Sequence, residues 1–212
     1  MIPFESRKDA ARRLAAALAK YSGRRPLVLA VPRGAVEIGA VLADRLGGEL
    51  DVVLVRKLRA PGNPELAVGA VDETGWVYVA EHAAQAGATP GYLERETREQ
   101  TELLRRRRAL YTPARAPIAI DGRVAIVVDD GVATGATMLA ALHAVREKRP
   151  ALLVCAVPVA AAESLAKLKS HADELVCLDT PLGFHAVGHA YRDFRQVGDD
   201  EVVALLKQGE AK

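Results

Sequence analysis

The sequence predicts an α/β fold in which an open parallel sheet carries helices on both faces. Short unbroken apolar runs, such as residues 26–31 and 124–128, are typical of strands that are buried on both sides. Helical patterns separate these runs, and repeated alternation of strand and helix indicates a parallel sheet. The length of 212 residues suits a single domain, and 50% hydrophobic residues with 4% aromatic ones predict a core of Ala, Val and Leu.

The N-terminal part is predicted to hold two helices and two buried strands. The stretch "SRKDAARRLAAALAKYSG" has a helical apolar stripe, with Ser6 as cap and Asp9 at the capping-box position. A strand at 26–31, a helix in "GAVEIGAVLADRLGG" and a strand at 50–57 follow.

Residues 58–118 are predicted to form an insertion made of a mobile loop and a helix. The Pro- and Gly-rich stretch 58–75 predicts a loop with a strand at "LAVGAV", and 76–80 is expected to pair with that strand. Thr89 caps a helix in "TPGYLERETREQTELLRRRRALY". Its apolar stripe is thin, so this helix is a candidate partner surface in a homodimer.

The C-terminal part is predicted to continue the alternation. Strands are expected in "RVAIVVDD", "ALLVCAVPV" and "ADELVCLDT", and helices in "GATMLAALHAVREK" and "AAESLAKLKS". Residues 181–198 are irregular, and 199–207 form a short last helix. Ligands of such sheets bind at the carboxyl ends of the strands, which directs attention to the segments that follow 26–31, 50–56 and 123–128.

The stretch "VAIVVDDGVATGAT", residues 124–137, joins two acidic residues to a candidate anion site. Asp129 and Asp130 follow a buried strand, and residues 134–137 open a helix whose first N–H groups lack internal partners. Such N–H groups bind phosphate. The segment has no G-K-[ST] and no G-x-G-x-x-G, which excludes the phosphate loop of nucleotide triphosphatases and the dinucleotide fingerprint.

A sugar phosphate explains both halves of this stretch. Carboxylates accept hydrogen bonds from sugar hydroxyls and are ligands that Mg²⁺ prefers. The phosphate is expected at Thr134–Thr137 and the hydroxyls at Asp129 and Asp130. In the alternative interpretation the two carboxylates only cap the helix, but capping needs one Asp rather than two.

These residues closely resemble the motif with which type I phosphoribosyltransferases bind 5-phosphoribosyl-1-pyrophosphate (PRPP). That motif has four apolar residues, two acidic ones, a variable trio and Thr-Gly-x-Thr. "VPRGA" (31–35) resembles the pyrophosphate loop of the family, and "RKLRAPG" (56–62) the basic start of its mobile loop. The resemblance covers about residues 25–180 and looks closest to an uncharacterised bacterial branch.

The resemblance implies a Mg²⁺-dependent pentosyltransferase in a single phosphoribosyltransferase-like domain. It would move the 5-phosphoribosyl group from PRPP to a base or small amine and release pyrophosphate. The implied catalytic residues are Arg33, Lys57, Asp129 and Asp130, with Mg²⁺ held at the two Asp residues, in part through water. The implied PRPP-binding residues are Arg33, Gly34, Ala35, Lys57, Asp129, Asp130, Gly131, Val132, Ala133, Thr134, Gly135, Ala136 and Thr137. Arg56 and Arg59 are weaker candidates.

The acceptor is not identified by these residues. Enzymes of the family that use 6-oxopurines carry an Asp just before the Thr-Gly pair, where this chain has Ala133. Orotate enzymes also have Ala nearby, so Ala133 argues against hypoxanthine and guanine but not against the family. A small hood from the chain ends supplies the acceptor pocket in this family. Residues 181–212 are the candidate hood, with 181–198 over the pocket, although an ordinary packed extension is equally open.

Two other functions remain as alternatives. A PRPP-binding regulatory protein without transfer activity would keep the sugar-phosphate site, but its support is limited to "RRRR" (105–108), and a net charge of +2 weighs against nucleic acid. The presence of Arg33 and Lys57 favours catalysis. A plain nucleotide-binding domain leaves the Asp pair unexplained. His185 and His189 have the spacing of helical metal ligands, but no third ligand for zinc is evident.

The remaining features favour a protein of nucleotide metabolism in the cytoplasm. Cys155 and Cys177 lie in apolar runs as free thiols do, and no signal peptide or membrane-length apolar run is present.

Overall fold

The computed structural model describes residues 4–113, 117–184 and 186–210. Its body is built on a five-stranded sheet in the order β2-β1-β6-β7-β8, in which every pairing is parallel. The strands are β1 (Leu27–Ala30), β2 (Glu49–Val52), β6 (Val124–Val128), β7 (Leu152–Val159) and β8 (Glu174–Asp179). The predicted open parallel sheet is confirmed.

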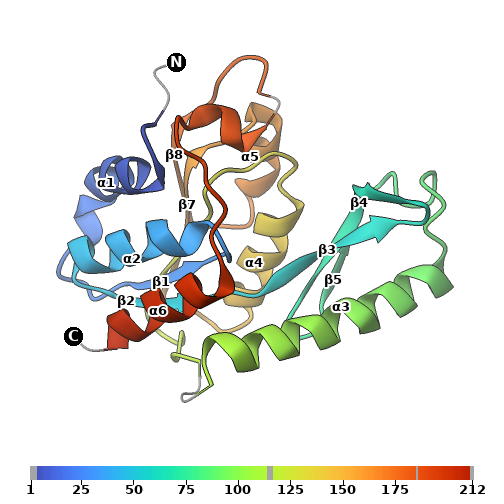
Figure 1. Ribbon diagram of the computed structural model, residues 1–212, viewed down its shortest axis with the longest axis horizontal. Coiled ribbons are helices and arrows are strands. Elements are labelled where there is room, and N and C mark those ends of the chain that lie inside the picture. The colour runs from blue at the N-terminus through green and yellow to red at the C-terminus, as the bar shows by residue number, and fades with distance from the viewer. Residues whose placement is uncertain (1–3, 114–116, 185, 211–212) are drawn as a thin grey trace.

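Helices cover both faces of this sheet (Figure 1). Side chains alternate between the faces, so Val28 of β1 belongs to one apolar cluster and Leu29 to the other. The first cluster packs under α1 (Arg7–Ala17) and α2 (Ala35–Leu46), with α6 (Asp199–Glu210) against α2. The second packs under α4 (Ala136–Arg146) and α5 (Ala162–Leu168). Two short 3₁₀ turns lie at Ala19–Tyr21 and Val187–Ala190.

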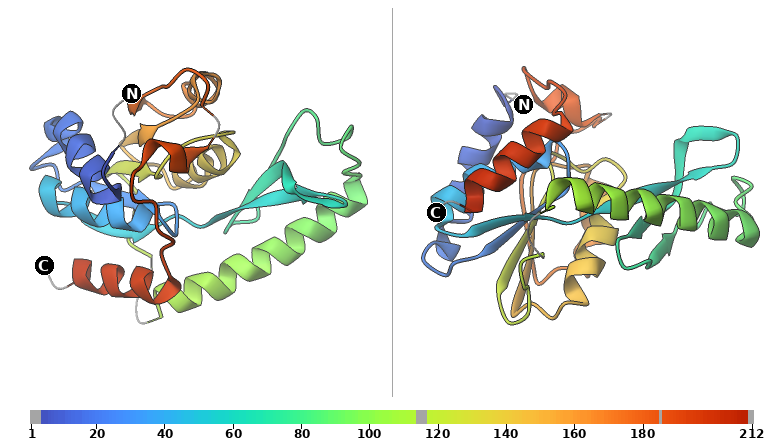
Figure 2. Two further views of the ribbon diagram at one scale, coloured as in Figure 1. Left: turned by 45° about the horizontal axis from the view of Figure 1, so that its top comes forward. Right: turned by 60° about the horizontal axis from the view of Figure 1, so that its bottom comes forward.

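A second, smaller unit extends from the body (Figures 1 and 2). It contains the antiparallel strands β3 (Val55–Ala60), β4 (Asn63–Asp72) and β5 (Val77–Val79), in that order, and the long helix α3 (Pro90–Tyr111). We call these elements the arm.

The arm corrects two sequence expectations. The loop predicted for residues 58–75 is a β-hairpin, because β3 and β4 pair around a turn at 61–62 in which Gly62 takes a positive φ of 73°. The Pro and Gly residues therefore mark a tight turn and not a long loop. The strand predicted at 50–57 is two strands, since β2 ends at Val52 and β3 begins at Val55 in a different sheet. The predicted pairing of 76–80 is confirmed by β5.

The helix caps follow the predictions more closely. The side chain of Ser6 accepts a hydrogen bond from the amide of Asp9, and Thr89 accepts one from that of Tyr92. The first helix ends at Ala17, before the predicted end, and the last helix runs past 207 to Glu210.

Arg108 of α3 fastens the root of the arm to the body. Its guanidinium lies 3.3 Å from a carboxylate oxygen of Asp51 in β2 and 2.9 Å from one of Glu73. Asp51 is 2% exposed, so the charge pair is desolvated and its geometry is restricted. Trp76 stacks on His143 of α4 with ring centroids 3.6 Å apart. These contacts place β3 beside the carboxyl edge of the sheet. Across residues 4–113, 117–184 and 186–210, we find no helix with the length and apolarity that crossing a bilayer requires.

Candidate active site

Two of the predicted segments leave the sheet side by side. Ala30 at the end of β1 is in register with Val128 at the end of β6, and the amide of Val31 donates to the carbonyl of Val128 at 3.0 Å. Residues 31–35 and 129–137 therefore begin at the same carboxyl edge. This is the edge at which parallel sheets generally bind their ligands.

The segment between β6 and α4 is held rigidly by its neighbours. The amide of Val132 donates to the carbonyl of Val159, and the amide of Ala161 donates to the carbonyl of Val132. Ser164 Oγ donates to the carbonyl of Ala133 at 2.5 Å. Gly135, with a φ of +83°, is the N-cap of α4 and brings no capping side chain. The first N–H groups of α4 at Ala136 and Thr137 are thus suited to an anion.

Asp130 is locked by an arginine that the sequence analysis missed. Arg7 of α1 places Nε at 2.9 Å and Nη2 at 2.8 Å from Asp130 Oδ2, while its Nη1 donates to the carbonyl of Arg195. Arg7 is 6% exposed. Burial raises the pKa of the Asp130 carboxyl, and the charge and hydrogen bond of Arg7 oppose that rise. The available signal was a charged residue on the apolar stripe of the first helix, because Arg7 precedes Ala10 and Leu14 at helical spacing.

The negative charge of Asp129 is less well compensated by neighbouring cations than that of Asp130. Its Oδ1 accepts a hydrogen bond from the amide of Asp130 at 2.8 Å. Burial raises the pKa of the Asp129 carboxyl well above its usual range, and the charge of Asp130 adds to the rise. The charges of Lys57 and Arg7 act in the opposite direction. Lys57, on the arm, therefore contributes to the electrostatic field at the predicted sugar-binding carboxylates.

The 31–35 segment rests directly on the pair of Arg7 and Asp130. A Cβ on Gly34 would lie 2.2 Å from Asp130 Oδ2 and 2.8 Å from Arg7 Nε, so only glycine fits this approach. The peptide bond between Pro32 and Arg33 is cis. The side chain of Arg33 is 43% exposed, and its Nη1 lies 3.9 Å from Asp199 Oδ2 in α6. Gly34 and Ala35 thus lie beside the 129–137 segment, whereas the Arg33 guanidinium points to α6.

Lys57 and Thr137 share one pocket. The pocket has a volume of about 310 Å³ and lies between β3, β4, α3 and the first turn of α4. Arg56 and Arg59 line it as well. The basic residues predicted from "RKLR" therefore do lie beside the predicted phosphate segment, although they belong to a strand and not to a loop.

The donors available to a metal ion suit Mg²⁺. Asp129 and Asp130 offer hard carboxylate oxygens next to each other. In the part of the chain that the structure describes, no three His, Cys, Asp or Glu side chains come together as a metal site. An ion at the two Asp residues would take its other ligands from water and substrate, which is how Mg²⁺ is commonly held. His185, one of the two residues considered for zinc, lies outside the described residues.

The segment 187–191 packs against the motif. Tyr191 donates its hydroxyl to the carbonyl of Asp130 at 2.5 Å. A Cβ on Gly131 would lie 2.5 Å from Val187 Cγ1, so glycine is required for this contact. Residues near the C-terminus thus lie over the segment that contains Ala133.

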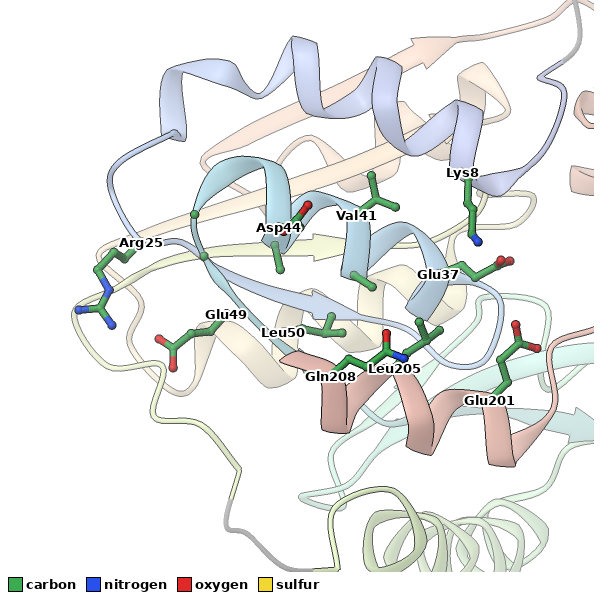
Figure 3. A pocket seen from close by; sticks show the side chains of 14 residues that line it. Lys8, Arg25, Glu37, Val41, Asp44, Glu49, Leu50, Glu201, Leu205 and Gln208 are labelled. Carbon is green, nitrogen blue, oxygen red and sulfur yellow. The ribbon is translucent and has the colours of Figure 1, made fainter. Parts of the chain in front are cut away.

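A larger pocket lies away from these residues. It has a volume of about 560 Å³ and runs between α2 and α6, and Glu37, Asp44, Glu201 and Gln208 are among the residues that line it (Figure 3). None of the predicted PRPP-binding residues lines it. Its lining has four carboxylates, Glu37, Asp44, Glu49 and Glu201, against the two cations Lys8 and Arg25, and this excess of negative charge disfavours a phosphate.

The four consecutive arginines do not form one surface. Arg105 is exposed, and Arg106 pairs with Glu102 on the outside of α3. Arg107 lines the pocket with Lys57, and Arg108 belongs to the buried root of the arm.

Comparison with known proteins supports one family. The model of the phosphoribosyl transferase domain matches residues 4–192. A Mycobacterium tuberculosis protein provisionally named a phosphoribosyl transferase is 43% identical over 205 residues, which are 96% of this chain and 46% of that protein. The chain thus spans about half the length of the curated relatives it matches. The crystal structure of TT1426 from Thermus thermophilus is 48% identical, with a TM-score of 0.82 over 97% of this chain and 98% of that one.

Proposed function

The chain belongs to the phosphoribosyl transferase family, and from that premise we propose that it is a Mg²⁺-dependent enzyme that transfers the 5-phosphoribosyl group from PRPP to a nucleophile. Pyrophosphate leaves in the reaction, and the nucleophile is a base or a small amine. The observation that carries the proposal is the meeting of the 31–35 segment, the Asp pair and the 134–137 segment at one edge of the sheet.

Each segment has a role that follows from its chemistry. The N–H groups and hydroxyls of Thr134–Thr137 bind the 5′-phosphate. Gly131, Val132 and Ala133 connect this segment to the two Asp residues, and their backbone lies along the sugar. Asp129 and Asp130 accept hydrogen bonds from the ribose hydroxyls. Lys57 and the backbone of Gly34 and Ala35 bind the pyrophosphate, and Arg33 joins them once its guanidinium turns away from Asp199 of α6. Mg²⁺ at the two carboxylates would neutralise charge on the diphosphate.

The chain's main contribution to catalysis is electrostatic. Breaking the bond between C1 and the pyrophosphate oxygen leaves positive charge on the sugar, as in glycoside cleavage, and negative charge on the leaving group. Positive groups fixed in advance around the leaving group stabilise that separation without reorganising during the reaction. Arg7 holds Oδ2 of Asp130 in place and opposes the rise in pKa that burial causes, and in the proposed complex Oδ1 of Asp130 faces the sugar.

The acceptor side of the proposal is less specific. Ala133 offers no carboxylate to a 6-oxopurine. Residues 181–198, as part of a hood at 181–212, cover the acceptor, and the contacts of Tyr191 and Val187 with the motif support this placement.

We also propose a cytoplasmic role in nucleotide metabolism. A homodimer through α3 is supported by Leu103 and Leu110, which are 41% and 48% exposed.

Calorimetry with PRPP and Mg²⁺ tests the proposal. We expect binding at micromolar strength, with Mg²⁺ alone and ribose without phosphate as controls. A folded protein that gives no heat with PRPP and Mg²⁺ would contradict it. A screen of bases and small amines for PRPP-dependent release of pyrophosphate then identifies the acceptor. Tight PRPP binding with no release for any acceptor would favour the regulatory alternative.

A further inference from the structure

We propose that Arg107 of α3, which belongs to none of the motifs, is a phosphate-binding residue that completes the pyrophosphate site with Arg56, Lys57 and Arg59. The inference rests on the proposed function and assigns a third element, α3, to the binding of the donor. It also gives the four consecutive arginines different roles, because Arg107 binds the ligand and Arg108 pairs with carboxylates of the protein.

The geometry brings these four cations together from two elements. Arg56, Lys57 and Arg59 come from β3, and Arg107 comes from the last two turns of α3. All four line the pocket of about 310 Å³ that also contains Thr137 of the predicted phosphate segment. The pocket thus contains Lys57, assigned above to the pyrophosphate, and Thr137, assigned to the 5′-phosphate of the same donor.

Nearby carboxylates offset the positive charge of this pocket only in part, through the charge of Glu96 on Arg56 and the interaction of Lys57 with Asp129. Among the described residues, none of the four cations forms an ion pair with a carboxylate, and Glu65 is the only acidic side chain of the lining. Of the other basic residues of α3, Arg98 pairs with Glu94 and Arg106 pairs with Glu102. Burial, together with the charges of Arg107 and Arg59, lowers the pKa of Arg56. Like charges held together at such a cost indicate a site for an anion.

Arg56 is fixed in position by α3 and not only by its own strand. Its Nε donates to Oε1 of Gln100, whose Nε2 donates in turn to Glu96 at 3.0 Å. Gln100 is buried. Tyr92 near the start of α3 donates its hydroxyl to the carbonyl of Arg59 at 2.8 Å. The helix thus holds β3 along its length, and Arg107 enters the pocket from a rigid element.

The ligand that fits is a pyrophosphate group. Several cations around one small pocket match several negative charges on adjacent phosphoryl groups, and guanidinium groups pair with phosphate oxygens in bidentate fashion. The reaction proposed above forms inorganic pyrophosphate, so the same cations would hold the leaving group as its charge develops.

Inorganic pyrophosphate titrated into the full chain by calorimetry is the test. Arg107→Gln is expected to weaken pyrophosphate binding about tenfold, as the loss of one charge-assisted contact predicts. Arg106→Gln, one residue away on the outer face, is the matched control and should bind as the parent chain does. Arg107→Lys should restore part of the affinity, because it keeps the charge without the planar fork. The thermal midpoint of Arg107→Gln should not fall, since Arg107 repels Arg56.

The outcomes separate this inference from the proposed function. If the parent chain binds PRPP and pyrophosphate and Arg107→Gln binds both equally well, the role of Arg107 is overturned and the function stands. If the parent chain binds pyrophosphate but not PRPP, and Arg107→Gln loses that binding, the pocket stands and the function fails. If Arg106→Gln weakens pyrophosphate binding as much as Arg107→Gln does, the effect comes from the net charge of the protein and the inference is overturned.

Discussion

Asp130, which follows β6, is half-buried and pairs with the buried Arg7, whereas Lys57, Arg59 and Arg107 on the arm line a pocket with no ion-paired carboxylate among the described residues. On the body side Asp130 is thus ion-paired within the protein, whereas the cations on the arm side form no ion pair among the described residues. A paired charge costs desolvation but fixes geometry, which suits a carboxylate that must meet particular hydroxyls. Unpaired cations repel one another until an anion arrives, which suits the binding of a phosphate group.

The largest effect is expected from removing the acidic pair on the body side. Asp129→Asn with Asp130→Asn should lower PRPP-dependent pyrophosphate release by at least about 1,000-fold, or about 4 kcal/mol of transition-state stabilisation. Circular dichroism should show that the variant folds. Asp121→Asn is a suitable control, because that carboxylate is 68% exposed and pairs with Arg149 far from the site. Turnover that survives in the double variant would remove these residues from the site.

A smaller effect, on stability, is expected from removing Arg7, the ion-pair partner of Asp130. Arg7→Met leaves Asp130 buried without its cation and should lower the free energy of unfolding by about 3 kcal/mol near neutral pH. Arg7→Lys should lose less, because it keeps a charge. Arg13→Met on the same helix removes an exposed pair with Asp9 and should cost no more than about 0.5 kcal/mol. Chemical denaturation measures all three, and equal losses for Arg7→Met and Arg13→Met would mean that burial of the pair is unimportant.

The smallest effect concerns pH and the uncompensated carboxylate on the body side. The folded protein holds the Asp129 proton more tightly than the unfolded chain, because its pKa is raised by burial and by Asp130. The stability this gives is present below the ordinary pKa of about 4 and is lost as the pH rises through the folded value. In the absence of Mg²⁺, Asp129→Asn should therefore have a free energy of unfolding about 1 kcal/mol above that of the parent chain at about pH 8, and an equal one at about pH 4. Chemical denaturation at the two pH values measures this difference, and a variant that is less stable at both would contradict it.

Local sequence patterns predicted much of the body and of the motif. Ser6 and Thr89 cap their helices as expected, and the unbroken apolar runs became parallel strands. The Asp pair and the 134–137 segment lie where the order of strand, turn and helix places them. These features depend on neighbours in the chain, so a single sequence is enough to recognise them.

The arm was predicted less well, because its signals have two interpretations. Pro61 and Gly62 are equally common in a loop and in the turn of a hairpin, and only pairing partners distinguish the two. The run "RRRR" appears as one charged block in the sequence. Successive residues of a helix differ in direction by about 100° around its axis. Arg107 therefore lines the pocket, whereas Arg106 lies on the outer face of α3.

The sequence by itself determined the fold class, the helix caps and the position of the acidic pair beside the turn that opens α4. Only the tertiary structure decided which distant charges meet that pair: Arg7, 123 residues before Asp130, and the arm cations around Thr137. The physical reason is that electrostatic and packing interactions depend on distance in space. A β-hairpin, a buried guanidinium and a glycine without room for a Cβ bring such charges together without leaving a pattern of fixed spacing along the chain.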